Sequence, residues 1–594
     1  MCGLCGEFRW DGTAADTEAV GRMRDPLAPR GPNGTGLWAH GPAALGHRRL
    51  AIIDLSEAGA QPMVDSDLGL TVAFNGCIYN YPALRAELIA AGYRFFSTSD
   101  TEVVLKAYHR WGTRCVEHFA GMFAFAIVER ASGRLVLARD RLGIKPLYLA
   151  ESPGRLRFAS TLPALVAAGG IDTSMDPVAL HHYLSFHSVV PAPRTILQGV
   201  RKLPPATVRV VEADGRMTDE VYWSPPHTRD PERRSMTASE WQEEVLERLR
   251  VAVARRMVAD VPVGVLLSGG IDSSLVVALL AGEGQTDLTT FSIGFEAAGG
   301  ESGDEFHYSD LIADHFGTRH HQIRIPTSDV LPAVEQAIAA MSEPMVSHDC
   351  VAFFLLSREV SKTVRVVQSG QGADEIFAGY DWYPPLAGVA REDAAQAYAR
   401  VFVDRSDAAL RDLLNPQWRL DNDPSRAFVA RHFDAPGAET ALDAALRLDS
   451  QIMLVDDPVK RVDNMTMAWG LEARVPFLDH EVVELAALCP PELKLAGGGK
   501  GVLKEASRKV LPAEVIDRKK GYFPVPAIRH LSGALLERVS DALNSQAARD
   551  RGLYQPEPIR RLLADPNSTR TTLGSNELWQ VALLELWLQE QGVG

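Results

Sequence analysis

The pattern of apolar and polar positions changes near residue 210, and this change predicts two parts of different architecture. Before it, apolar runs of strand length lie at residues 70–75 and 122–128. Segments 81–91 and 101–111 have the spacing that is typical of amphipathic helices. The first part is therefore predicted to be rich in strands, with helices between them.

After about residue 236, apolar strands and helices alternate. Strands are predicted at 263–267, 290–295, 321–325 and 364–368, and helices at 240–257, 274–281 and 308–316. Such alternation is typical of a parallel sheet wrapped by helices, which binds ligands at the carboxyl ends of its strands. The remainder, from about residue 385, is predicted to be mainly helical.

Prolines and charges between the two patterns predict a linker. Pro204-Pro205 and Ser224-Pro225-Pro226 interrupt the chain, and a charged run follows at 229–234. Breakers of this kind place the linker at residues 213–236, between a first domain at 2–212 and a second at 237–594. A chain of 594 residues is long enough for roughly two to four domains.

Composition and charge exclude several classes of function. Hydrophobic residues make up 46% and charged residues 23%, as in soluble globular proteins. The formal net charge of -15 argues against a nucleic-acid partner, because phosphate backbones require clustered Lys and Arg. The sequence shows no apolar run near the ~18 residues of a membrane span and no secretory signal. Its six irregularly spaced cysteines do not predict a disulfide scaffold, so a cytoplasmic enzyme without a membrane partner is expected.

Cys2 directly follows the initiator methionine, whose removal would leave one residue with both a thiol and a free α-amine. An α-amine has a pKa of roughly 7.7–8.0 and can accept the thiol proton. One residue would then supply nucleophile and general base, as in N-terminal nucleophile hydrolases. The segment 47–54 offers a guanidinium for a carboxylate, and the segment 99–102 offers a carboxylate for an ammonium group, which together would complement a zwitterionic amino acid. Asn75-Gly76 offers an amide side chain and a flexible glycine near a developing oxyanion. Taken alone, a cysteine at position 2 is more often incidental.

A second candidate site follows the predicted strand at 263–267, where Ser268-Gly269-Gly270-Ile271-Asp272-Ser273 leads into a helix. Glycines let the backbone approach an anion, and hydroxyl and helix-start N–H groups donate to it. Asp272 could hold Mg²⁺ beside phosphates. The spacing differs from the G-x-x-x-x-G-K-[ST] loop of kinases and GTPases. It predicts the pyrophosphate loop of enzymes that cleave ATP between its α and β phosphates.

Two later segments support a nucleotide site. Ser369-Gly370-Gln371-Gly372-Ala373-Asp374 follows another predicted strand and offers Asp374 as a second carboxylate for Mg²⁺. Lys500 follows three glycines and could stabilise charge on the α-phosphate as pyrophosphate leaves. Alone, the Ser-Gly-x-Gly loop could equally be a turn, and a lysine is more often solvated.

Over essentially the whole chain, these motifs resemble the glutamine-hydrolysing asparagine synthetase family. The matching segments are Met1-Cys2-Gly3, Arg30-Gly31-Pro32, Arg49-Leu50, Asn75-Gly76, Ser99-Asp100, 121–125, 139–148, 268–273, 369–375 and 470–479. The resemblance implies an α/β fold in two domains. The first would be an N-terminal nucleophile hydrolase αββα sandwich, and the second a pyrophosphate-loop domain with a parallel sheet and a helical C-terminal part. It also implies an internal tunnel for ammonia.

The resemblance assigns expected roles to individual residues. Cys2 is the expected nucleophile, Asn75 and Gly76 form the oxyanion hole, and Lys500 acts in adenylation. The residues expected to bind glutamine are Arg49, Ile52, Ile53, Asn75, Gly76, Cys77 and Asp100. Those expected to bind ATP are Leu266, Ser268, Gly269, Gly270, Asp272, Ser273, Ile293, Ser369 and Gly370, with Mg²⁺ at Asp272 and Asp374.

Two positions depart from the family pattern. Cys77 stands where Glu usually follows Asn-Gly, so glutamine is expected to contact the backbone there. Gln371 stands where bacterial enzymes that use aspartate have Glu, and it is expected to face a less cationic acceptor. These variants are similar to the N-acetylglutaminylglutamine amidotransferases, which implies an acetylated dipeptide as the acceptor. Asparagine synthesis from aspartate is the alternative.

The motifs argue against other functions. A simple glutaminase or a phosphoribosyl amidotransferase has no need of the pyrophosphate loop. A non-catalytic protein with this fold would be expected to have lost Cys2, Asp272, Asp374 or Lys500, and all four are present. Glutamine, ATP and a carboxylate acceptor are therefore the expected small-molecule partners. A homodimer stays open as the assembly.

Overall fold

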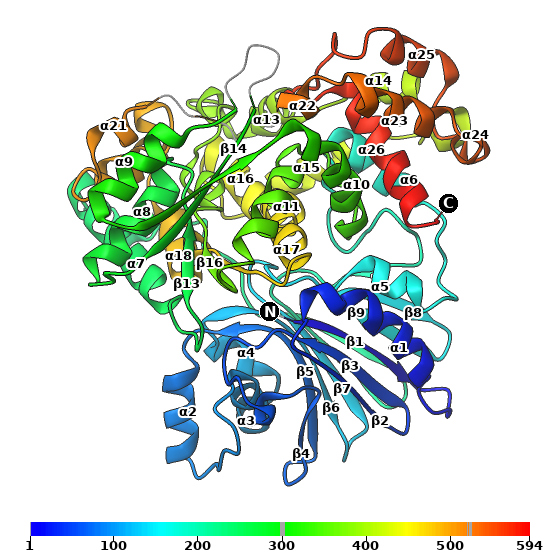
Figure 1. Cartoon of the computed structure of the whole chain (residues 1–594), viewed down its shortest axis with the longest axis vertical. Helices are drawn as coiled ribbons and strands as arrows, with labels where there is room; N and C mark the ends of the chain where they lie inside the picture. Colours follow the sequence, from blue (N-terminus) through cyan, green and yellow to red (C-terminus); the bar gives the residue numbers. More distant parts are fainter. Residues whose placement is uncertain (1, 297–302, 519–520, 522–525, 594) are drawn as a thin grey trace.

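The computed structural model describes residues 2–296, 303–518, 521 and 526–593. Within them the chain forms two halves, which lie one above the other in Figure 1. The first half contains two antiparallel sheets packed face to face, and the second surrounds a parallel sheet. This architecture confirms the predicted α/β fold class.

The first half is a sandwich of two sheets, each with six strands in the described part of the chain. The first sheet has the order β10 (Arg201–Lys202), β8 (Tyr148–Ser152), β9 (Arg155–Ala159), β1 (Gly3–Arg9), β3 (Ala43–Arg49), β2 (Gly34–His40). The second has the order β12 (Met217–Val221), β11 (Thr207–Val211), β7 (Arg134–Arg139), β6 (Gly121–Glu129), β5 (Leu70–Ile78), β4 (Met63–Asp65).

Alternation of side chains along the strands gives each sheet two apolar faces. Leu4 and Phe8 of β1 meet Ala73 of β5 and Ala124 of β6 in the core between the sheets. Phe74, one residue after Ala73, points to the opposite face and packs under helices. Helices α1 (Thr17–Arg24) and α5 (Leu162–Ala167) cover the first sheet, and α2 (Tyr81–Ala90), α3 (Asp100–Trp111) and α4 (Cys115–His118) cover the second (Figure 1). Helix α6 (Pro177–Ser185) instead packs against α15 (Pro424–Asp434) of the second half. The layers follow the predicted αββα order.

The second half has a five-stranded parallel sheet within the described residues. Its order is β15 (Arg319–Ile325), β14 (Thr289–Phe295), β13 (Val263–Leu266), β16 (Val366–Gln368), β17 (Glu472–Arg474). Four of these strands agree with the sequence prediction. The fifth, β17, lies in the region predicted to be mainly helical and pairs with β16 through Val366–Glu472 and Gln368–Arg474.

Helices cover both faces of this sheet. Val265 and Leu267 face one helical layer, whereas Leu266 faces the other, as expected for a strand buried on both sides. The helices of this half are α7 (Ala238–Arg255), α8 (Ile271–Gly282), α9 (Phe306–Phe316), α10 (Val330–Ala340), α11 (Asp349–Val360), α12 (Ala373–Phe377), α13 (Ala394–Phe402), α14 (Asp407–Leu413), α15 (Pro424–Asp434), α16 (Ala441–Leu448), α17 (Lys460–Met467), α18 (His480–Leu488), α19 (Pro491–Leu495), α20 (Gly501–Ser507), α21 (Ala513–Ile516), α22 (Pro526–Arg529), α23 (Gly533–Asn544), α24 (Gln546–Arg551), α25 (Pro556–Ala564) and α26 (Glu577–Glu590). Among the described residues, no helix is both long and apolar enough to cross a bilayer.

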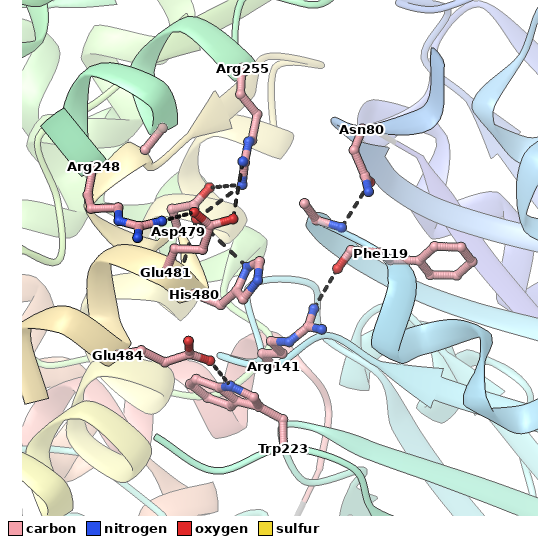
Figure 2. A network of polar contacts seen from close by, with 12 residues as sticks. Asn80, Phe119, Arg141, Trp223, Arg248, Arg255, Asp479, His480, Glu481 and Glu484 are labelled. Atoms are coloured by element: carbon pink, nitrogen blue, oxygen red, sulfur yellow. Dashed lines mark hydrogen bonds and ion pairs between the residues drawn. The ribbon is translucent and has the colours of Figure 1, made fainter. Parts of the chain in front are cut away.

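The stretch 213–236, predicted as a linker, is partly built into the fold. It contains β12, which pairs with β11 at the edge of the second sheet. Trp223 then donates from Nε1 to Glu484 of α18 at 2.7 Å (Figure 2). Thr237 and Glu240 form a capping box that begins α7. The connection between the halves is thus anchored at both ends.

The segment that leads into α18 joins the two halves (Figure 2). Asp479 pairs with Arg255 of α7 at 3.1 Å, and His480 lies beside Arg141 of the first half. Arg141 donates to the carbonyl oxygen of Phe119 at 2.5 Å. The start of α18 therefore rests on a loop of the sandwich and on α7 at the same time.

Deeper in the interface, a buried carboxylate holds two cations of the first half. Asp463 of α17 pairs with Arg30 at 2.8 Å and with Lys145 at 2.9 Å. Burial acts to raise the pKa of Asp463, but the two cations outweigh it and lower the pKa to about 2. Removing one partner of a buried charge pair is strongly destabilising, so this contact fixes the relative position of the halves.

Candidate active sites

Cys2 lies just before β1, with only 6% of its surface exposed. Its backbone nitrogen donates to Asn75 Oδ1 at 3.0 Å, and its Sγ lies 4.0 Å from the carbonyl oxygen of Leu50. Burial raises the pKa of the Cys2 thiol, so the thiol is protonated near neutral pH and needs a base to attack. Removal of Met1 would make the nitrogen that contacts Asn75 an α-amine on the same residue.

The strand β5 supplies the features expected of an oxyanion hole. Asn75 Nδ2 is buried and has no hydrogen-bond partner among the described residues, although its Oδ1 accepts from Cys2. A buried amide donor without a partner calls for an explanation, and a developing negative charge beside the thiol provides one. Gly76 follows, and a Cβ there would lie 2.2 Å from the Met122 carbonyl oxygen, so only glycine fits.

A cavity beside Cys2 brings the predicted glutamine-binding residues together. Its lining comprises Cys2, Arg49, Leu50, Ile52, Ile53, Gly59, Gln61, Phe74, Gly76, Cys77, Ser99, Asp100, Thr101 and Glu472. Of the predicted set, Asn75 alone is not in this lining; its amide oxygen contacts the Cys2 nitrogen instead. Glu472 was not predicted, and it comes from the other half of the molecule.

Two charged side chains of the sandwich face this cavity. Arg49, at the end of β3, donates to the carbonyl oxygen of Ser56 at 2.7 Å and to that of Asp54. Asp100 begins α3 directly after the capping residue Ser99, and it accepts a hydrogen bond from the backbone of Ile78 at 3.1 Å. Burial raises the pKa of Asp100 to about 6.

The raised pKa of Asp100 leads to a testable pH dependence. If Asp100 binds the α-ammonium of glutamine, its ionised form is the active one, and protonation below pH 6 weakens binding. If the Cys2 α-amine is the base, kcat/KM would also fall about tenfold per pH unit below the pKa of that amine. We expect kcat/KM for glutamate release to fall by a further factor of about ten for each pH unit below pH 6. Asp100→Asn should abolish only this second slope; an unchanged profile in that variant would contradict the assignment.

A second cavity lies at the carboxyl ends of β13, β14 and β16, where a nucleotide site was predicted. Its lining comprises Leu266, Leu267, Ser268, Asp272, Ser273, Phe291, Ser292, Ile293, Glu305, Phe306, Ser309, Phe353, Leu356, Ser369, Gly370, Gln371 and Asp374. Two predicted residues, Gly269 and Gly270, are absent from this lining. Glu305, Ser309, Phe353 and Leu356 were missed, because they lie in or next to helices and carry no loop signature.

The two glycines shape the first loop. Gly269 has φ +74, and a Cβ there would lie 2.6 Å from the backbone nitrogen of Ser309. Gly270 caps α8, whose first turn presents N–H groups to the cavity. Gly370 of the second loop leaves no room for a Cβ either, which would lie 2.7 Å from the Ser273 nitrogen. Gly269 is therefore required for the close approach of the first loop to α9, and Gly370 for the close approach of the two loops.

Lys500, from a distant part of the chain, contacts two carboxylates that line the cavity. It precedes α20 in the left-handed region, at φ 56, and its Nζ lies 2.7 Å from Asp272 and 2.8 Å from Asp374. Burial acts to lower the pKa of Lys500, but the two carboxylates outweigh it and raise the pKa well above its usual value. Two carboxylates that converge on one cation also fit Mg²⁺, which takes carboxylate, water and phosphate oxygens as ligands.

Comparison with known proteins covers both halves of the chain. A family model described as asparagine synthase matches residues 244–589, and one described as a glutamine amidotransferase domain matches residues 1–223. The chain belongs to the glutamine-hydrolysing asparagine synthetase family. It is accordingly an ATP-dependent ligase of the asparagine synthetase type with a glutamine amidotransferase half.

Three curated relatives of this family illustrate the extent of the similarity. Glutamine-hydrolysing asparagine synthetase 3 of Bacillus subtilis is 31% identical over 549 residues, which cover 88% of this chain and 87% of the relative. Asparagine synthetase 1 of the same organism is 30% identical over 627 residues, covering 99% and 96%. Asparagine synthetase B of Escherichia coli is 29% identical over 545 residues, covering 88% and 82%. The match therefore extends over nearly the whole chain.

Proposed function

We propose that Cys2 frees ammonia from glutamine. Its sulfur bonds to the carbon of the side-chain amide, while the α-amine takes the thiol proton and passes it to the leaving nitrogen. The C–N bond breaks, ammonia leaves, and water then hydrolyses the thioester to glutamate. The unpartnered Asn75 Nδ2 supports this assignment, because the charge on the amide oxygen develops beside the thiol.

We propose that the second half activates a carboxylate with ATP. An oxygen of the acceptor attacks the α-phosphate, pyrophosphate leaves, and ammonia then displaces AMP from the acyl adenylate. The observation that carries this proposal is the position of Lys500, held between Asp272 and Asp374 beside two glycine-containing loops. Mg²⁺ held by the two carboxylates would neutralise phosphate charge. Lys500 would stabilise the charge that gathers as pyrophosphate departs.

Ammonia would pass between the sites through the apolar contact of the two halves. Ile52, Met122 and Ile144 of the sandwich belong to the same buried cluster as Leu267 and Val475 of the synthetase half. Such a lining suits neutral ammonia, because apolar side chains cannot protonate it to ammonium. A path there would also keep ammonia from bulk water.

The relatives favour aspartate as the acceptor, because each of the three is an asparagine synthetase by name. We therefore propose aspartate first and the acetylated dipeptide second. One observation supports N-acetylglutaminylglutamine as the acceptor. Gln371, an uncharged side chain, lines the nucleotide cavity together with the loop carboxylate Asp374. An acceptor without a free ammonium group would suit a neutral amide better than a carboxylate.

An assay with ATP, Mg²⁺ and glutamine identifies the acceptor. With aspartate, we expect AMP and pyrophosphate in equal amounts and asparagine by mass. Gln371→Glu should then lower KM for aspartate several-fold, because a carboxylate attracts the α-ammonium of that substrate. AMP formation with N-acetylglutaminylglutamine alone would assign the dipeptide instead, and Gln371→Glu would not improve its binding. Absence of AMP with both would refute the adenylation proposal for these acceptors.

A further inference from the structure

The strand β17 places one synthetase-half side chain, Glu472, in the wall of the glutamine pocket, and another, Arg474, in contact with two residues of that wall. Glu472 is only 1% exposed, yet it lines the cavity that also contains Cys2 and Asp100. Arg474, equally buried, donates from Nε to Glu472 at 2.6 Å and reaches Cys77 Sγ at 3.6 Å. The wall of the glutamine pocket is thus made by both halves of the chain.

The charges of this pocket complement the α-carbon end of glutamine. The lining includes one guanidinium, Arg49, and two carboxylates, Asp100 and Glu472. Arg49 suits the α-carboxylate of the substrate, which leaves both carboxylates for its α-ammonium. Burial acts to raise the pKa of Glu472, but the positive charge of the chain's N-terminal ammonium and, after it, that of the Arg474 guanidinium outweigh burial and lower this pKa. The negative charge of Glu472 in turn contributes to the raised pKa of Asp100.

We infer that Glu472 is a specificity-determining residue for glutamine, whose carboxylate, together with Asp100, recognises the α-ammonium group of the substrate. This inference rests on the proposed roles of Cys2 and Asp100. The two carboxylates line the same cavity, and the charge of Glu472 raises the pKa of Asp100, so an ammonium group bound between them would relieve their repulsion. Recognition of the ammonium group then selects glutamine over amides that have no α-ammonium group.

The position of Glu472 is set by rigid neighbours. Its strand pairs with β16, and the Arg474 carbonyl oxygen accepts from the backbone of Ser369 at 2.9 Å. The Arg474 guanidinium also donates to the carbonyl oxygens of Arg256 and Val258, each at 2.7 Å. A carboxylate held by such a network is pre-organised, so binding of glutamine costs little additional conformational entropy at this side chain.

The test compares Glu472→Gln with the native enzyme on two substrates. Glutamine carries the α-ammonium, whereas glutaramate is the same amide without the α-amino group. We expect the variant to raise KM for glutamine about tenfold or more, as for loss of a hydrogen bond to a charged group. Hydrolysis of glutaramate should be the same in both proteins. AMP formation supported by ammonium salts should also be unchanged.

Glu7→Gln is the matched control. Glu7 is likewise 1% exposed and pairs with Arg157 at 2.7 Å, but it lies outside both cavities. It should leave KM for glutamine unchanged. An equal loss on glutamine and glutaramate in Glu472→Gln would overturn the inference, because it would assign Glu472 a structural role through Arg474. An unchanged KM for glutamine would overturn it as well. Failure of the proposed function would show differently, as native enzyme that releases no glutamate from glutamine.

Discussion

Cys2→Ala is expected to abolish glutamine-dependent amidation, by a factor of about 10⁴ or more, while synthesis from ammonium salts continues at the native rate. The thiol is the nucleophile in our proposal, and no other thiol lines the cavity except Cys77. Burial raises the pKa of Cys77 to a value far above its usual range, and its Sγ accepts from Arg474. Cys77 is therefore a poor substitute for Cys2.

Glutamate release and AMP formation should be measured in parallel, with glutamine or with ammonium salts as the nitrogen source. Cys5→Ala is the control, because Cys5 is a fully buried thiol on β1 that donates to the Val20 carbonyl oxygen at 3.6 Å, away from the cavity. It should retain glutamine-dependent activity. Glutamate release by Cys2→Ala would contradict the role of the thiol. Intact mass of active native enzyme should lack Met1, and retention of Met1 would exclude the α-amine as base.

Features that depend on residues adjacent in the sequence could be predicted from the sequence. Asn75-Gly76 ends an apolar run, and Ser268-Gly269-Gly270 joins a strand to a helix, so both segments could be recognised from the residues next to them in the sequence. The pairing of Lys500 with Asp272 and Asp374 could not be predicted in this way. It depends on packing of α20 against α7, α8 and α12, although the expected role of Lys500 pointed to the same site.

Glu472 shows why other parts of the site were missed. It belongs to a segment, 470–479, that resembles the family, but β17 has only three residues and no periodic pattern. The strand exists because it pairs with β16, far away in the sequence, and its contact with the Cys2 cavity depends on how the halves dock. The same holds for β12 within the predicted linker, which forms by pairing with β11.

Replacing Lys500 by methionine is expected to slow AMP formation about 10²- to 10³-fold, because a preorganised charge beside the reacting phosphate contributes this much to catalysis. Glutamate release from glutamine at Cys2 should persist. Lys504→Met is the matched control: Lys504 lies on the same helix, and it donates to the Gly497 carbonyl oxygen at 2.8 Å on the outer side. That variant should form AMP at the native rate.

The Mg²⁺ dependence of Lys500→Met separates a catalytic role from a structural one. In the native protein the ammonium group neutralises two carboxylates, Asp272 and Asp374, at 2.7 and 2.8 Å. Without it, their mutual repulsion is relieved only by another cation, so the Mg²⁺ concentration for half-maximal activity should fall. Slow AMP formation in this variant would mean that Lys500 acts on the reacting phosphate. A lower Mg²⁺ requirement would mean that Lys500 and the metal share the same two carboxylates. A variant with native AMP formation would instead contradict the catalytic role of Lys500, since its charge would then serve only to hold two loops together.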